Sequence, residues 1–346
     1  MKHLGFIPAI VAALVLPASA QLPRAAPEAT PVKIGGYLSA EYLKGQAASG
    51  YFQGSFENAR GGVLLFGDWA SRFGGALEFA LTQDGRGELV QAWADVRASE
   101  AFQVKVGLFL VPFGRYNESR RAFQTLLVFD PYPVSDLFPE SWRDIGAVLS
   151  GRLGRFQYSA YLGNGLAEGE TLASGRPLHD NNKDKGRGGR AGYAFSPNLE
   201  VGASYYHGRV DEADSRAETL WGADLVWVSN SGRLTGEYIK AEIQNPSPFS
   251  PGRAEGYFAM LTLDFGALTP LVAYETLSYE DPFHGPGFGG PDVPGAGISR
   301  DLTRWAFGAV YAPHPNLRLK IEYDVNREGG GEVRNNILRV QAAVHF

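Results

Sequence analysis

The sequence predicts an all-β protein: a transmembrane antiparallel up-and-down β-barrel of about sixteen strands, with one long loop folded into its lumen. Three observations predict this fold. Apolar and polar residues alternate with a period of two from residue 32 almost to the end of the chain. The alternating segments have the roughly ten-residue length of tilted spanning strands, and alternately short and long connections join them. Glycine (44 residues) and aromatic residues (12%) are abundant whereas methionine (2) is scarce, which is typical of β proteins.

The N-terminal residues indicate a secretory signal. Lys2 and His3 form a short polar start, an apolar run extends from Leu4 to Leu16, and Ala18-Ser19-Ala20 matches a cleavage site. We therefore expect residues 1–20 to be a signal peptide cleaved after about Ala20, residues 21–31 a short N-terminal extension, and residues 32–346 the barrel. Beyond the signal, no segment approaches the roughly 18 consecutive apolar residues of a spanning helix. These features together predict a protein of the bacterial outer membrane.

Composition excludes several classes of protein. Removing residues 1–20 takes away one basic residue, which leaves 31 Lys and Arg against 37 Asp and Glu, a charge of −6. A nucleic-acid binder would normally be basic. The chain has no cysteine, which excludes a disulfide framework and thiolate metal sites. The six histidines are not spaced as metal ligands on one strand, so we expect neither a metal site nor a cofactor.

The segment from Leu317 shows the alternation most clearly. Its apolar face is Leu317, Leu319, Ile321, Tyr323 and Val325, and its polar face is Arg318, Lys320, Glu322, Asp324 and Asn326. Lipid outside and water inside a barrel require this arrangement, so we expect the apolar faces to point outward.

The same reasoning places the other strands in order. The expected ranges are 32–43, 55–66, 72–82, 89–98, 101–112, 143–151, 154–163, 188–195, 198–208, 218–229, 232–243, 255–265, 269–280, 302–312, 317–327 and 333–346. The clearest further apolar faces are Ile34, Gly36, Leu38, Ala40 and Tyr42; Phe73, Leu77, Phe79 and Leu81; Phe102, Val104, Val106, Leu108 and Leu110; Phe156, Tyr158, Ala160 and Leu162; Tyr257, Ala259, Leu261, Leu263 and Phe265; and Leu338, Val340, Ala342, Val344 and Phe346. The segments 55–66, 218–229 and 269–280 alternate less cleanly.

The connections divide into two kinds. Long ones include 113–142, 164–187, 209–217, 244–254 and 281–301, and the connections between them are turns of a few residues. Outer-membrane barrels have short periplasmic turns and longer external loops, so both ends of the chain are expected on the periplasmic side.

The loop 113–142 carries the candidate pore constriction. Its charged residues, with the first residue after it, are Arg115, Glu118, Arg120, Arg121, Asp130, Asp136, Glu140 and Arg143. A loop of this kind folded into the lumen would narrow it and set a field across it. The alternative is a loop that lies over the external mouth with solvated charges. The expected lumen-facing residues of the strands are Lys105, Arg304, Arg318, Lys320, Glu322, Asp324 and Arg339, with Glu78 and Asp264 also inward.

Several segments support a named resemblance. The run 105–117 (KVGLFLVPFGRYN), the segment 142–146 (WRDIG), the opening 33–38 (KIGGYL) and the strand end 161–165 (YLGNG) resemble the phosphate-selective porin (O/P-like) family. The resemblance implies a sixteen-stranded barrel, often trimeric, whose basic lumen conducts anions such as phosphate. From Phe113 to Arg143, however, four arginines stand against four acids, so phosphate selectivity does not simply carry over.

The sequence therefore predicts an aqueous channel for passive diffusion of small polar solutes or ions. Its expected partners are outer-membrane lipid and lipopolysaccharide, the solutes, and two further copies in a homotrimer, but no nucleic acid. Two alternatives remain open. One is a conduit or scaffold barrel that sheathes a partner such as a haem protein. The other is an outer-membrane barrel enzyme, although no nucleophile motif such as G-x-S-x-G occurs.

Overall fold

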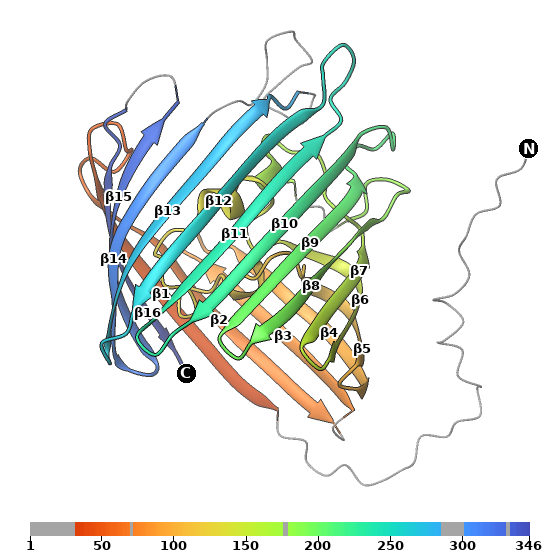
Figure 1. Cartoon of the computed structure of the whole chain (residues 1–346), viewed down its shortest axis with the longest axis horizontal. Coiled ribbons are helices and arrows are strands. Elements are labelled where there is room, and N and C mark those ends of the chain that lie inside the picture. The colour runs from red at the N-terminus through yellow and green to blue at the C-terminus, as the bar shows by residue number, and fades with distance from the viewer. Residues whose placement is uncertain (1–31, 70–71, 176–178, 285–300, 330–332) are drawn as a thin grey trace, which may run out of the picture. The chain divides into compact units, whose positions relative to one another are not determined.

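The computed structural model describes residues 32–69, 72–175, 179–284, 301–329 and 333–346. The expected signal peptide and N-terminal extension, residues 1–31, lie outside the described residues. Sixteen strands form one closed antiparallel barrel in which each strand pairs with its neighbours in sequence and β1 pairs with β16 (Figure 1). The strands are β1 (Lys33–Gly45), β2 (Ser55–Trp69), β3 (Phe73–Thr82), β4 (Gly87–Ser99), β5 (Phe102–Leu110), β6 (Arg143–Leu153), β7 (Phe156–Gly163), β8 (Gly186–Ser196), β9 (Leu199–Arg209), β10 (Ala217–Val228), β11 (Gly232–Ile243), β12 (Gly252–Leu263), β13 (Leu268–Asp281), β14 (Leu302–His314), β15 (Leu317–Glu328) and β16 (Ile337–His345).

The predicted fold class and strand order are confirmed. The three segments that alternate less cleanly are strands β2, β10 and β13. The outward and inward faces of β15 are also as expected: Ile321 is 51% exposed, whereas its neighbour Lys320 is 2% exposed. Apolar side chains cover the outside because water is absent there, and polar side chains point inward.

Two residues depart from the predicted faces. Leu110 lines the lumen rather than the lipid side. The pairing of β4 with β5 ends at Ala92 and Leu108, so β4 no longer holds Leu110 in the wall and the chain turns inward. Gly107 precedes this turn with a φ of 131°, a conformation that favours glycine. Asp264 lies beyond the end of β12 at Leu263 and is exposed in the following short turn, so it is not part of the inner face of that strand.

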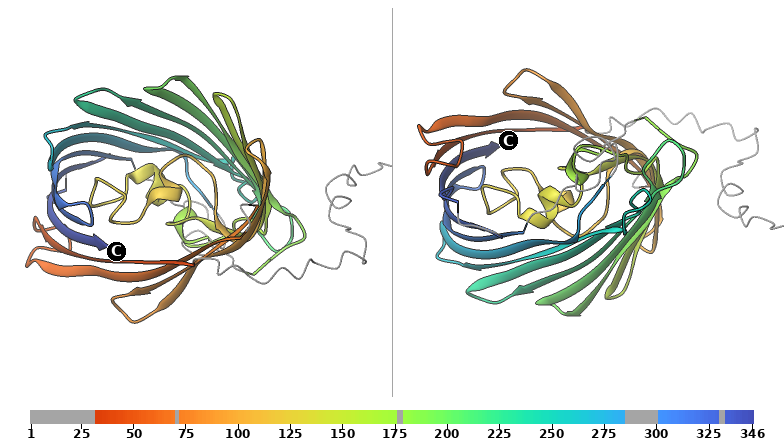
Figure 2. Two further views of the ribbon diagram at one scale, coloured as in Figure 1. Left: turned by 90° about the horizontal axis from the view of Figure 1, so that it is seen from below. Right: turned by 90° about the horizontal axis from the view of Figure 1, so that it is seen from above.

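The long connection between β5 and β6 lies inside the barrel. It contains a 3-10 turn, η2 (Asn117–Ser119), and a short helix, α1 (Tyr132–Asp136). Views along the barrel show this segment, in yellow, across its interior (Figure 2). We call the chain from Val111 to Trp142 the inner loop. No helix among the described residues is long and apolar enough to cross a membrane.

A hydrophobic core fills part of the barrel. Trp142, at the end of the inner loop, packs against Phe113, Phe138 and Tyr206 with ring centroids 5.0–5.7 Å apart. Inward apolar side chains of the wall join this cluster: Tyr206 of β9, Leu220 of β10, Ile239 of β11, Phe258 of β12 and Leu277 of β13. Part of the connection between β7 and β8, with its turn η3 (Leu172–Ser174), packs there too. Because interiors of this kind are close-packed, side chains of the described residues fill this side of the lumen.

Candidate pore and its lining

The inner loop is tied to the wall at its start. Gly114 donates its backbone N–H to Ser204 Oγ on β9 (3.0 Å). The backbone N–H groups of Arg115 and Tyr116 both donate to Glu237 Oε1 on β11 (2.7 Å each). A buried carboxylate that accepts two backbone N–H bonds is a strong anchor, so the entry of the loop is held against β9 and β11.

The middle of the inner loop is tied to a neighbouring part of the wall, on β13 and β15. Glu322 on β15 accepts the N–H of Val128 (2.8 Å), and Lys320 donates to the Leu127 carbonyl (3.1 Å). Glu275 on β13 accepts the N–H of Tyr132 (2.6 Å). These bonds join residues that are more than 140 positions apart in the sequence. They hold the loop within the barrel rather than over its mouth.

These anchors change the role of the inward charges on β14 to β16. Arg304, Arg318, Lys320, Glu322, Asp324 and Arg339 all point inward as expected, but the inner loop covers them. Arg304 forms a buried pair with Glu275 (2.8 Å) and lies against the ring of Tyr132. Arg339 donates to Asp324 (2.6 Å), and Arg318 bonds weakly to two loop carbonyls. Of the predicted lumen-facing residues, Lys105 lines two of the cavities described below, and Asp324 is held by Arg339. The others contact the inner loop directly.

The arginines of the inner loop are also paired. Arg115 contacts Glu200 on β9 (2.5 Å), and Arg121 forms two bonds with Glu78 on β3. Arg120 binds Asp130 within the loop (2.6 and 2.8 Å). Arg120 therefore stabilises the loop through an ion pair within it, whereas Arg115 and Arg121 connect the loop to the wall through ion pairs.

Of the remaining predicted residues, two have polar partners and two are exposed inside the barrel. Asp136 belongs to α1 and accepts a bond from the Ser135 hydroxyl (2.9 Å). Glu118 and Glu140 are exposed inside the barrel, and Arg143 begins β6 with its guanidinium on Glu88 (2.5 Å).

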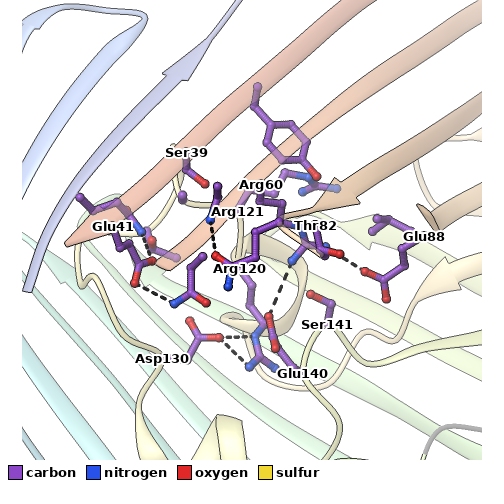
Figure 3. Close-up of a pocket in the computed structure, with 18 of the residues that line it drawn as sticks. Ser39, Glu41, Arg60, Thr82, Glu88, Arg120, Arg121, Asp130, Glu140 and Ser141 are labelled. Atoms are coloured by element: carbon purple, nitrogen blue, oxygen red, sulfur yellow. Dashed lines mark hydrogen bonds and ion pairs between the residues drawn. The ribbon is translucent and has the colours of Figure 1, made fainter. Parts of the chain in front are cut away.

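The largest of three cavities described here, about 800 Å³, lies between the inner loop and strands β1 to β4 (Figure 3). Arg60 of β2 contacts Glu88 (3.1 Å) and Glu140 (3.7 Å) across this space. Its charged lining consists of five arginines and six acids. They are Arg60, Arg86, Arg120, Arg121 and Arg143, and Glu41, Glu78, Asp84, Glu88, Asp130 and Glu140. Charges of both signs line the cavity in nearly equal number.

Two smaller cavities continue toward the rim of short turns. One has a volume of about 390 Å³ and the other about 290 Å³. Arg121 borders the largest cavity and the second, and Lys105 and Glu118 border the second and third. Leu110 borders all three, so these spaces follow one side of the barrel.

Several lining residues lie outside the predicted set of site residues. Glu41 accepts amide N–H groups from Asn58 (2.9 Å) and Gln341 (2.6 Å), which ties β1 to β2 and β16. Arg60 lies on β2, where the pairing shifts register, so its inward direction could not be derived from simple alternation. Glu88 precedes the expected start of its strand at residue 89. The period-two alternation therefore did not identify Arg60 and Glu88, which lie nearest to a register shift and to a strand end.

The external rim carries an ionised carboxyl. Asp84, in the turn between β3 and β4, accepts hydrogen bonds from the Thr82 hydroxyl and the Arg86 guanidinium, which lower its pKa. It remains charged at neutral pH at the entrance of the largest cavity. Within the described part of the chain, no group of three or more His, Asp or Glu side chains is arranged to hold a metal ion.

Comparisons with known proteins agree with this geometry. The sequence matches the family described as Gram-negative porin over residues 9–331. A protein of Aquifex aeolicus described as uncharacterized is 25% identical over 284 residues, 71% of this chain, and this chain spans 64% of that protein's length.

The fold is similar to solved outer-membrane structures. OmpT of Vibrio cholerae in its trimer form has a TM-score of 0.67 and 14% identity, covering 92% of this chain and all of that one. Salmonella typhi OmpF in complex with daunomycin scores 0.64 at 14% identity (92% and 98% covered). The outer-membrane channel DcaP of Acinetobacter baumannii scores 0.64 at 12% identity (92% and 97%). At these identities the structures show a shared fold, and the family match shows that this chain belongs to the Gram-negative porin family.

Proposed function

We propose that this protein is an outer-membrane channel for the passive diffusion of small polar solutes and ions. The observation that carries the proposal is the cavity of about 800 Å³ between the inner loop and β1 to β4, lined by charges of both signs. A sixteen-stranded barrel is wide enough for an aqueous channel, and the inner loop narrows it on one side. The predicted constriction residues that border the cavities are Glu118, Arg120, Arg121, Asp130, Glu140 and Arg143.

Unsatisfied donors support a wet passage. The Nε of Arg60 and the Nε and Nη1 of Arg143 are buried without a protein partner. Buried polar groups are almost always hydrogen-bonded, so water or solute oxygens are the natural partners of these three nitrogens.

The charge balance argues for weak ion selectivity. A strong preference for phosphate would need an excess of basic groups, but five arginines face six acids around the largest cavity. We therefore propose a channel with no marked phosphate preference, in contrast to the channel that the sequence resemblance implies. The reversal potential in a gradient of potassium chloride measures this directly, and a strongly anionic reversal potential would contradict it.

The inner loop also bears on the conduit alternative. A barrel that sheathes a partner needs an open lumen, whereas this lumen holds a packed core of its own residues. We propose that the protein is a porin without catalytic activity, and that it assembles as a homotrimer in contact with lipid and lipopolysaccharide. The trimer form of a structurally similar protein supports this assembly. Light scattering of detergent-purified protein would test it.

The decisive experiment is conductance in planar lipid bilayers. Purified protein, cleaved after about Ala20, should insert and give stable steps whose current is proportional to voltage. Heat-denatured protein from the same preparation is the control. Well-inserted, folded protein that passes no ions would reject the proposed function.

A further inference from the structure

The second cavity, next to the Arg121–Glu78 ion pair, has apolar side chains in its lining. Its volume is about 390 Å³, and Leu64, Phe66, Trp93 and Phe123 are among its lining. The lumens of membrane barrels are polar, so apolar side chains beside the passage call for a physical reason. Phe66 remains 40% exposed, and it points into the lumen rather than into the lipid.

The strand register forms a slot between two aromatic side chains. Phe66 on β2 pairs with Ala76 on β3, and Ala76 pairs with Trp93 on β4. All three point inward at one level of the wall. Neighbouring strands lie about 4.8 Å apart, so the backbones that carry Phe66 and Trp93 are roughly 10 Å apart. Ala76 contributes only a methyl group, so no large side chain of β3 separates the two at this level, and a flat ring needs about 3.5–4 Å on each of its faces.

A cation stands beside this slot. The Lys105 Nζ lies 4.6 Å from the centre of the Trp93 ring. Across the described residues, Lys105 forms no ion pair with a carboxylate, whereas the guanidinium of Arg121 is bonded to Glu78. Glu118 borders the same cavity and is exposed, which keeps the local charge low. A single carboxylate on a solute would therefore meet Lys105 without a large local excess of positive charge.

We propose that this cavity is a binding subsite for aromatic monocarboxylates, whose ring enters the slot between Phe66 and Trp93 while the carboxylate faces Lys105. This inference rests on the proposed channel function and names a solute class for it. Aromatic side chains bind flat rings through area burial and offset or edge contacts. The attraction to Lys105 adds a charge term that salt screens. Small inorganic anions and aliphatic acids gain only the second of these two interactions.

Current block in planar bilayers tests the subsite. With potassium chloride carrying the current, benzoate should interrupt it at concentrations at which acetate and benzylamine leave it unchanged. Phe66→Ala should raise the half-blocking concentration of benzoate about two- to tenfold. Lys105→Gln should weaken the block at about 0.1 M salt, and the difference from the unmodified protein should vanish near 1 M, where the screening length is only ~3 Å.

Two variants serve as matched controls. Phe102→Ala removes an aromatic ring of similar exposure (48% against 40%) from the lipid-facing side of β5, and Arg253→Gln removes a cation of β12 that borders none of the three cavities. Neither should change benzoate block. Normal chloride conductance with equal effects of benzoate and acetate would overturn this inference and leave the channel intact. Equal block by benzylamine would overturn the role of Lys105, and absent conductance would instead reject the proposed function.

Discussion

The two sides of the barrel have similar outer faces and opposite inner ones. On the side of β2 to β5, the inward residues at mid-wall include Glu78, Gln91 and Lys105, and they border cavities. On the side of β9 to β13, inward residues such as Tyr206 and Phe258 are apolar and fully buried. Outward alternation builds the wall on both sides. The inward composition decides where the lumen is filled and where solutes can pass.

The largest expected effect follows from emptying the filled side. Trp142→Ala removes a side chain that packs against four aromatic rings, and it should lower the free energy of unfolding by ~3–5 kcal/mol. The loosened inner loop should also raise the single-channel conductance. Thermal unfolding in detergent and bilayer recordings measure the two effects. An unchanged melting temperature would mean that the filled side is not a packed core.

The outer faces provide the second comparison, because the two sides should respond alike there. Leu77→Arg on β3 and Val272→Arg on β13 each place a charge on the lipid face, at the fifth residue of a strand. Each should cost ~2–4 kcal/mol near mid-membrane. Unfolding from lipid vesicles in urea measures the cost. A large difference between the two variants would break the equivalence of the outer faces.

The anchors of the inner loop give a smaller effect. Lys320→Gln shortens a buried side chain that donates to the Thr125 hydroxyl (3.0 Å) and the Leu127 carbonyl (3.1 Å), and it should cost ~1–3 kcal/mol. We expect greater current noise because the loop is less firmly held. Arg86→Gln, at an exposed pair on the rim, is the control and should change stability by less than ~1 kcal/mol. Equal results for both variants would show that Lys320 is not an anchor.

The smallest effect concerns ion preference on the open side. Arg121→Gln leaves Glu78 beside the passage without its cationic partner, so the reversal potential should shift toward cation preference at low salt. The shift should disappear near 1 M salt, because the screening length there is ~3 Å. A reversal potential that stays constant while the conductance rises would assign Arg121 a purely bracing role.

The sequence predicted the wall more completely than the pore. Sixteen strands and the lipid-facing residues follow from local alternation, since side chains on a strand point to opposite faces in turn. The sequence also contains a sign of the filled side of the lumen, namely a strand whose two faces are both apolar. On β12, Phe258 and Met260 lie between the outward Tyr257, Ala259 and Leu261, so both faces of that strand are apolar.

The sequence predicted which charged residues lie inside the barrel, but not which of them border the cavities and which hold the inner loop. Lys320 was expected beside the passage, and the structure buries it against the inner loop. Arg120 lines the largest cavity, but it is paired with Asp130. Arg60, Glu88 and Trp93 were not expected there, and they border cavities. Their positions depend on bulges and on where strand pairing ends, which no local pattern specifies.

By itself, the sequence determined the fold class, the number and order of strands, the faces of the wall and the presence of a long charged loop. These features rest on interactions between neighbours in sequence or on the contrast between lipid and water. Only the tertiary structure decided where the inner loop lies, which charges it covers and which side of the lumen remains open. The physical reason is that anchors such as Val128 to Glu322 join residues 194 positions apart. Pairings over that distance depend on barrel closure, which no single segment encodes.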